Sequence, residues 1–411
     1  MKAVTLCVLL FGISQSMPTS DIWEQLVISD FDSIDHVSSF KNWQSKYNKK
    51  YNNSDDEAKH FLTFLDNWRM INNHNKKYES GKTTFTMGLN QFGDMTFDEF
   101  RMYVHGHSGS CMTQRDDVYH ISTATSSQKS NKPVISVDPV DPVESSSSSS
   151  DDLNELVNEI EKELDNLMPQ VSIKDNEIDM NMPGVGEFSF KFGRRLQDVP
   201  SSIDWTNING STYVTPVKNQ GQCGSCWAFS TTGSIESRSA IKNGWTGSEV
   251  ISLSEQQLVD CSRAEGNAGC NGGLMEDAFK YVEKAGGLCT EKEYPYTARD
   301  GSCKSSSCGK KYDPITGYKV VQKDSEPALQ EAVAAGPVSV SVDAAGETWQ
   351  FYRSGVVDGH CGILLDHGVL AVGYGHDNSQ NLDYWKIKNS WGKTWGEQGY
   401  IRLCRNCNKN N

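Results

Sequence analysis

The sequence has no apolar run long enough to cross a membrane. The apolar stretch at residues 3–13 is shorter than the roughly 20 residues that a membrane-spanning helix needs, and no later segment is apolar enough. One lysine precedes this stretch and small residues follow it at Ser14 and Ser16. That pattern is typical of a secretory signal peptide at residues 1–16, although a buried N-terminal strand is an alternative. We therefore expect entry into the secretory pathway, ending outside the cell or in a lysosome or vacuole.

Positive charge is also scarce. The chain has 39 Lys and Arg residues against 53 Asp and Glu residues, a net charge of -14, which argues against a nucleic-acid partner. The acidic excess is greatest at residues 106–193, where 16 acidic residues stand against 6 basic ones beside a run of six serines. Such a composition buries too little apolar surface to offset the entropy of ordering. We expect residues 106–197 to be an acidic, serine-rich linker or insert, with an amphipathic helix at residues 151–167 that either docks or stands alone.

The remaining sequence divides into two parts. In residues 30–105, apolar residues recur at three- and four-residue steps and predict one face of a helix: Phe61, Phe64, Leu65, Trp68 and Ile71. A polar stretch with two arginines, "GRRLQ", then marks a boundary and a candidate proteolytic site. In residues 198–411 we expect a helix from Ser225, its cap, to Lys242, with Gly244 stopping it. "EPALQEAVAAG" predicts a second helix, and "VSVSVDA", "HGVLAVGYG" and "YWKIKNSW" predict strands. The pattern indicates an α+β fold, a helical half followed by a β-rich half.

The stretch "QGQCGSCWAFS" contains Cys223 and Cys226, a spacing found in redox dithiols, zinc sites and around catalytic nucleophiles. A redox pair needs a βαβ unit around it, which is missing here. A zinc site needs a second ligand pair nearby, but the next such pair is far along the chain, so we expect no metal. A nucleophile explains more, because a cysteine in the first turn of a helix is stabilised as the thiolate.

A thiolate nucleophile needs a general acid, and histidines are few. After residue 195 the histidines are His360, His367 and His376. His367 begins an apolar stretch that predicts a strand, where its ring can be held rigidly, whereas the other two lie in loop-like sequence. Asn389 in "KNSWG" can orient the imidazole, and Trp391 can shield that hydrogen bond from water.

Three blocks, "QGQCGSCWAFS", "DHGVLAVGYG" and "KNSWGKTWGEQGYI", resemble the active-site blocks of papain-like cysteine proteases, especially the cathepsin L-like branch. The resemblance implies a papain-like two-domain fold, with the cleft between a helical and a β-barrel domain, and peptide hydrolysis without a cofactor. It implies that Cys226 is the nucleophile, His367 the acid and base, Asn389 the orienting residue and Gln220 a donor to the oxyanion hole.

The same resemblance implies further residues. The positions that would bind substrate are Gly272, Gly273, Leu274, Met275, Ser341, Leu365, Gly368 and Trp391. The implied disulfides join Cys223 to Cys270 and Cys261 to Cys303. Five cysteines are left without an assigned partner: Cys289, Cys308, Cys361, Cys404 and Cys407. Relatives have a longer tail than the ten residues after Ile401. We therefore expect a poorly closed pocket floor, with either Cys404 or Cys407 as a substitute partner for Cys361 or, as the alternative, a truncated C-terminus.

The N-terminal part, residues 30–105, resembles the inhibitory proregion of these proteases through "DDEAKHFLTFLDNWRMINNHN" and "GLNQFGD". It departs from the family pattern at Asp56 and His60, which puts the usual ion pairing in doubt. The resemblance implies a monomeric zymogen whose partners are protein and peptide substrates and its own proregion as inhibitor. An inactive homologue that binds peptides or inhibits proteases is the alternative, and labelling of Cys226 by an active-site-directed epoxide would separate the two.

Overall fold

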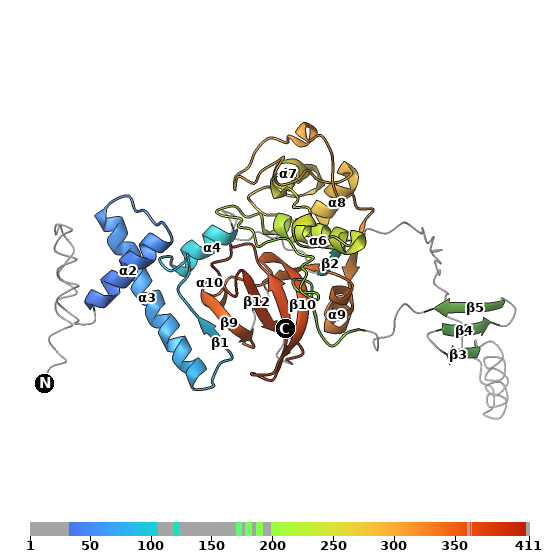
Figure 1. Ribbon diagram of the computed structural model, residues 1–411, viewed down its shortest axis with the longest axis horizontal. Coiled ribbons are helices and arrows are strands. Elements are labelled where there is room, and N and C mark those ends of the chain that lie inside the picture. The colour runs from blue at the N-terminus through green and yellow to red at the C-terminus, as the bar shows by residue number, and fades with distance from the viewer. Residues whose placement is uncertain are drawn as a thin grey trace, which may run out of the picture. The chain divides into compact units, whose positions relative to one another are not determined.

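The computed structural model of the protein describes residues 33–105, 119–122, 170–174, 177–182, 186–191, 199–359, 362 and 364–407. The expected signal peptide and the helix expected at residues 151–167 lie outside these residues. The chain divides into two compact units, residues 1–125 with 202–411 and residues 126–201 (Figure 1). No helix in the described parts of the chain is both long and apolar enough to cross a bilayer.

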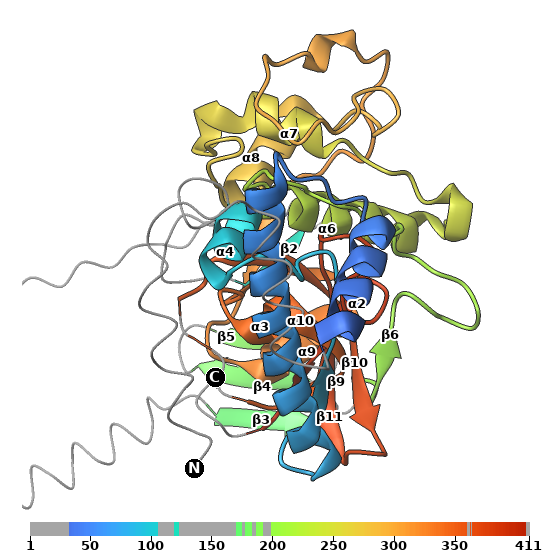
Figure 2. The same ribbon diagram turned by 90° about the vertical axis from the view of Figure 1, so that its left-hand side faces the viewer.

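The first two helices among the described residues of the first unit lie near its N-terminal side. They are α2 (Ser33–Lys46) and α3 (Ser54–Glu79). The side chain of Asn53 accepts a hydrogen bond from the Asp56 amide and so caps α3 at a backbone donor that the helix leaves unsatisfied. Phe61 and Phe64 are buried against Phe40 of α2. The helix and the apolar face that the sequence predicts are therefore confirmed. In Figure 2, α2 and α3 lie nearest the viewer.

A short strand and a third helix connect these helices to the rest of the unit. They are β1 (Phe85–Met87) and α4 (Phe97–His105). β1 pairs antiparallel with β9 (Tyr352–Val357), so it extends the edge of the main sheet. The rings of Phe92 and Phe100 lie edge-on to the indole of Trp391, with centroids 5.9 and 5.4 Å away. The segment of residues 33–105, called the N-terminal segment below, is thus held to the unit by both a strand and an aromatic cluster.

Helices dominate the chain from residue 226 to residue 307. They are α6 (Cys226–Asn243), α7 (Glu255–Cys261) and α8 (Met275–Ala285), with the 3-10 helices η2 (Gly247–Glu249), η3 (Ser262–Glu265) and η4 (Ser305–Ser307). α6 and α8 share one apolar core. α6 ends at Gly244, whose φ of 72° lies in the left-handed region that favours glycine. Ser225 occupies the N-cap position, but its side chain makes no cap hydrogen bond. Its hydroxyl instead lies 2.6 Å from the Tyr296 hydroxyl. The predicted cap position is therefore confirmed, but the side-chain hydrogen bond expected of a cap is not made.

Strands dominate the chain from residue 318 onward. They are β7 (Tyr318–Val321), β8 (Val338–Val342), β9, β10 (His367–Asp377), β11 (Leu382–Lys388) and β12 (Tyr400–Cys404), with α9 (Glu326–Ala334) and α10 (Glu347–Phe351) between them. The order in the sheet is β1-β9-β12-β11-β10-β8-β2-β7, where β2 is Tyr119–Ser122, and β6 (Ile203–Asp204) pairs with β10. The pairs are antiparallel except β9 with β12. Figure 1 shows α6, α7 and α8 on one side of these strands, which confirms the predicted α+β arrangement of a helical half and a β half.

Four disulfides have both of their cysteines among the described residues. They join Cys223 to Cys270, Cys261 to Cys303, Cys289 to Cys308 and Cys404 to Cys407. The first two are the pairs that the family resemblance implies. The last two give partners to four cysteines that the sequence analysis left unassigned. Because Cys404 pairs with Cys407, the expectation that one of them replaces a partner of Cys361 was wrong; Cys361 lies outside the described residues.

The second unit contains a three-stranded antiparallel sheet. Its strands are β3 (Gln170–Lys174), β4 (Glu177–Met182) and β5 (Gly186–Lys191). The composition of the whole acidic stretch predicted no strands here, because an average over residues 106–193 hides local patterns. Apolar and polar residues nevertheless alternate locally, and the register pairs Ile173 with Ile178 and Met180 with Phe188. Local alternation is the signal that could have found this sheet.

Candidate active site

Cys226 lies where the helical half meets the β half. It is the first residue of α6, it is fully buried, and the Gly368 amide donates a hydrogen bond to its Sγ at 3.1 Å. The amides at a helix N-terminus and the helix dipole favour a negative charge. Gly368 directly follows His367 at the start of β10. The helical half therefore supplies a sulfur atom, and the β half supplies the imidazole of the residue that precedes Gly368 in the chain.

His367 is held from two sides. Its Nε2 lies 2.8 Å from Asn389 Oδ1, which also accepts a hydrogen bond from the Ser390 amide at 2.7 Å. Since an amide oxygen only accepts, Nε2 of His367 is the donor. The indole of Trp391 stacks on the imidazole with centroids 4.7 Å apart. Burial lowers the pKa of His367 to about 4, and the bond to Asn389 opposes that shift. The imidazole thus has a fixed orientation and a cover against water.

Gln220 lies in the same region with its side chain fully buried. Its Oε1 accepts a hydrogen bond from the Ser390 hydroxyl at 2.7 Å, and its backbone amide donates to the Ser390 carbonyl at 2.8 Å. Its Nε2 donates to the Val104 carbonyl at 2.9 Å and to the Cys223 carbonyl at 3.0 Å. The first of these acceptors belongs to the N-terminal segment, so that segment occupies the donor that the resemblance assigns to an oxyanion.

The end of α4 fills the space beside these residues. His105 is fully buried, its Nε2 lies 3.2 Å from Asp366 Oδ2, and its ring centroid lies 6.1 Å from that of His367. Burial, with the nearby charges of His367 and Arg101, lowers the pKa of His105 to about 3. Burial raises the pKa of Asp366 to about 7. A β-carbon on Gly224 would lie 2.6 Å from the His105 carbonyl oxygen, so only glycine admits the segment this closely.

The residues expected to bind substrate fall into different surroundings. Ser341 and Leu365 line a cavity of about 520 Å³ whose walls include Val340, Trp349 and Ile387. Leu274 and Met275 are buried in the core of the helical half and do not line that cavity. Gly368 lies against Cys226 and Trp391 against His367. Gly272 and Gly273 are buried at the loop before α8, where a β-carbon on Gly273 would clash with the Asn267 side chain.

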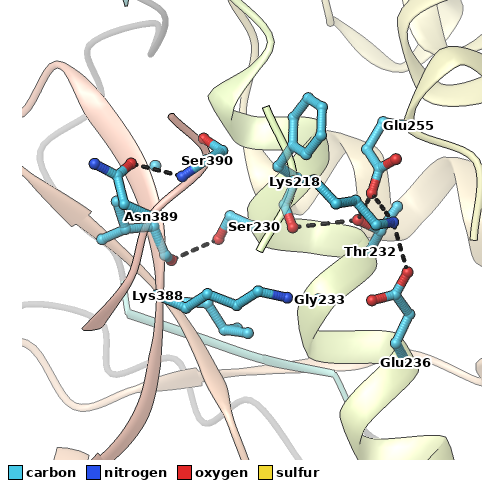
Figure 3. A pocket seen from close by; sticks show the side chains of 13 residues that line it. Lys218, Ser230, Thr232, Gly233, Glu236, Glu255, Lys388, Asn389 and Ser390 are labelled. Atoms are coloured by element: carbon cyan, nitrogen blue, oxygen red, sulfur yellow. Dashed lines mark hydrogen bonds and ion pairs between the residues drawn. The ribbon is translucent and has the colours of Figure 1, made fainter. Parts of the chain in front are cut away.

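Sequence reasoning missed a buried ionic network behind the site (Figure 3). Lys218 Nζ lies 3.0 Å from Glu236 and 2.5 Å from Glu255, and Lys388 Nζ donates to Thr215 at 3.0 Å. Burial lowers the pKa of Lys388 to about 8. The available signal was a lysine in the strand "YWKIKN", whose neighbours are mostly apolar or aromatic. In the described residues no group of three His, Cys, Asp or Glu side chains is arranged to hold a metal ion.

Comparison with known proteins gives matches to both parts of the first unit. Residues 199–411 match the family described as papain family cysteine protease, and residues 40–100 match the cathepsin propeptide inhibitor domain. The chain is 38% identical to procathepsin L of Rattus norvegicus over 373 residues, which cover 89% of this chain and 86% of the rat protein. Among solved structures, digestive procathepsin L 3 of Tenebrio molitor larval midgut has a TM-score of 0.63 and 34% identity, with 90% of this chain and 94% of that chain covered.

Two rice relatives match a shorter stretch. The chain is 51% identical to cysteine protease 1 of Oryza sativa subsp. japonica over 211 residues, which cover 51% of this chain and 42% of the rice protein. Oryzain beta chain of the same organism is also 51% identical, with 44% of its length covered. The chain thus spans less than half the length of these two relatives.

Proposed function

The chain belongs to the papain family of cysteine proteases, and from that premise we propose that it is a cysteine endopeptidase made as an inactive zymogen. Cys226 is its nucleophile, His367 its general acid and base, Asn389 the residue that orients His367, and Gln220 a donor to the oxyanion. One observation carries this proposal. The sulfur of Cys226 from the helical half and the imidazole of His367 from the β half lie in one site. There the Val104 carbonyl of the N-terminal segment accepts a hydrogen bond from the Gln220 side-chain amide.

The reaction proceeds in two steps. The Cys226 thiolate attacks the carbonyl carbon of the scissile bond, and the carbonyl oxygen becomes an oxyanion that the Gln220 amide and the Cys226 backbone amide stabilise. The C–N bond breaks as the His367 imidazolium gives its proton to the leaving amine, and a thioester to Cys226 remains. Neutral His367 then takes a proton from water, which attacks the thioester. The acid product leaves, and thiolate and imidazolium are restored.

The N-terminal segment acts as the intramolecular inhibitor. It occupies the Gln220 donor with the Val104 carbonyl and fills the space beside His367 with the His105 ring. Removal of this segment frees the Gln220 donor and the space beside His367. Maturation at the polar "GRRLQ" stretch yields the active domain, and acid triggers it.

Substrate preference follows from the walls around Ser341 and Leu365. The neighbouring residues Val340, Trp349 and Ile387 are apolar, so a Leu, Val or Phe side chain next to the cleaved residue is favoured. Burying such a side chain contributes about 1.5–3 kcal/mol. The enzyme acts as a monomer on protein and peptide substrates, outside the cell or in a lysosome or vacuole.

Replacement of the nucleophile tests the proposal. Cys226→Ala should abolish thiol-dependent peptide hydrolysis and labelling by an active-site-directed epoxide, whereas the matured wild-type protein should show both. Hydrolysis that survives in Cys226→Ala would contradict the assignment. A folded wild-type protein that neither hydrolyses peptides nor reacts with the epoxide would favour the peptide-binding alternative.

A further inference from the structure

The ionic network behind the active site joins two segments that carry active-site residues. Lys388 is the last residue of β11, and Asn389 follows it directly. Lys218 comes two residues before Gln220, and its backbone carbonyl accepts a hydrogen bond from the Gly392 amide at 3.0 Å. The two lysine side chains therefore belong to the two backbone segments that position the imidazole and the oxyanion donor. In Figure 3 the Lys388 side chain points towards Gly233 of α6, whereas Lys218 reaches both Glu236 of α6 and Glu255 of α7.

A chain of hydrogen bonds runs from β11 to α6. Lys388 Nζ donates to Thr215 Oγ1 at 3.0 Å, and the Thr215 hydroxyl donates to Glu236 Oε2 at 2.6 Å. The other oxygen of Glu236 accepts from Lys218 Nζ at 3.0 Å and from the Leu253 amide at 2.8 Å. Glu236 lies on α6, the helix that begins with Cys226. The network thus connects the strand next to Asn389 with the helix of the nucleophile.

The charged side chains of this network are buried, which is unusual in a protein core. Lys388 is 8% exposed and Glu236 is 1% exposed. Buried ion pairs are often no more stabilising than apolar side chains of the same volume, because desolvation offsets their attraction. Hydrogen bonds, however, are directional, whereas apolar contacts tolerate sliding. The network therefore sets one position of β11 relative to α6.

We propose that Thr215 and Lys388 are positioning residues, which act through Asn389 to hold His367 at the right distance from Cys226. This inference rests on the proposed cysteine protease function. The Asn389 side chain contacts His367 at 2.8 Å, and the residue after His367 contacts the sulfur at 3.1 Å. A shift of β11 along α6 therefore moves the imidazole away from the thiolate, and small displacements of this kind have large effects on rate.

The test compares two substitutions of one residue in the matured enzyme. Thr215→Val keeps the shape of the side chain and removes the hydroxyl link, and Thr215→Ser keeps the link. Epoxide labelling counts the reactive Cys226 sites, so kcat is expressed per labelled site. For Thr215→Val we expect kcat to fall about 10- to 100-fold with KM changed less than about twofold. Thr215→Ser should stay within about twofold of the wild type in both.

The split between kcat and KM is the readout that a merely structural role would not give, because labelled sites are folded and bind substrate normally. A Thr215→Val enzyme with wild-type kcat per labelled site would overturn the proposal. Labelling of wild-type Cys226 tests the protease function separately.

A charge-balanced variant covers the case in which Thr215→Val yields no labelled protein. Lys388→Met combined with Glu236→Gln removes one charge of each sign and leaves the pair of Lys218 and Glu255, so no buried charge loses its counterion. We expect this double variant to be labelled by the epoxide and to show the same loss of kcat. A wild-type kcat per labelled site would overturn the positioning role.

Discussion

Replacement of His105 by glutamine should make the zymogen more resistant to acid activation. His105 is buried in the active site only while the N-terminal segment is docked. Its pKa is about 3 there because of burial, against an ordinary value of 6.5. Below pH 6.5 the undocked segment binds a proton that the docked one does not, so His105 weakens docking as the pH falls towards 3. Over 1.5 pH units between pH 6.5 and 5, this amounts to about 2 kcal/mol.

Asp366 acts in the opposite direction. Burial raises its pKa to about 7 from an ordinary value of 3.8. Docking therefore takes up a proton at Asp366 below pH 7, which favours docking in acid and is lost as the pH rises through 7. Between pH 8 and 5 this contributes about 2.7 kcal/mol. In the wild type these two contributions nearly cancel, so the acid trigger lies in other groups, and His105→Gln opposes that trigger because it leaves only the contribution of Asp366.

The assay uses full-length Cys226→Ala protein, so that only added mature wild-type enzyme can cleave it. At a fixed dose of that enzyme, cleavage follows the undocked fraction of the N-terminal segment. The ratio of wild-type to His105→Gln cleavage rates should be close to 1 at pH 8 and about 30 at pH 5. His36→Gln, on α2 against Trp68, is the matched control and should give a ratio near 1 at both pH values. A His105→Gln ratio that does not change with pH would refute the reasoning.

Three further predictions concern catalysis, maturation and specificity. Asn389→Ala should lower kcat about 10- to 100-fold without changing the circular dichroism spectrum, since it removes the orientation of His367; an unchanged kcat would contradict that role. Mass spectrometry of wild-type protein held at acidic pH should show a fragment that begins between Arg195 and Pro200, and a persistent full-length chain would count against this maturation. Fluorogenic dipeptides should be cleaved faster with Leu, Val or Phe than with Arg next to the cleaved residue, and the reverse order would show that the walls around Ser341 are wrongly assigned.

Local signals in the sequence predicted the helices α3, α6 and α9, the strands β8, β10 and β11, and the chemistry-bearing residues. The apolar spacing of Phe61 and Phe64 predicted α3, and Gly244 marked the end of α6, because neighbours along the chain decide these features. "VSVSVDA" likewise predicted β8 by its alternation. The identities of Cys226 and His367 followed from a helix start and from the scarcity of histidines. Composition averaged over residues 106–193 concealed the β3-β4-β5 sheet, whose alternation is visible only over five or six residues.

Only the tertiary structure decided which distant residues meet. Lys388 and Thr215 are 173 residues apart and Gln220 and Val104 are 116 apart. The local sequence around one member of each pair does not predict the other member, because packing of the whole core selects the partners. The same packing buries His105 against Asp366 and lowers the pKa of one while it raises that of the other. The sequence therefore determined which groups could do the chemistry, and the tertiary structure decided how they are oriented and how the N-terminal segment covers them.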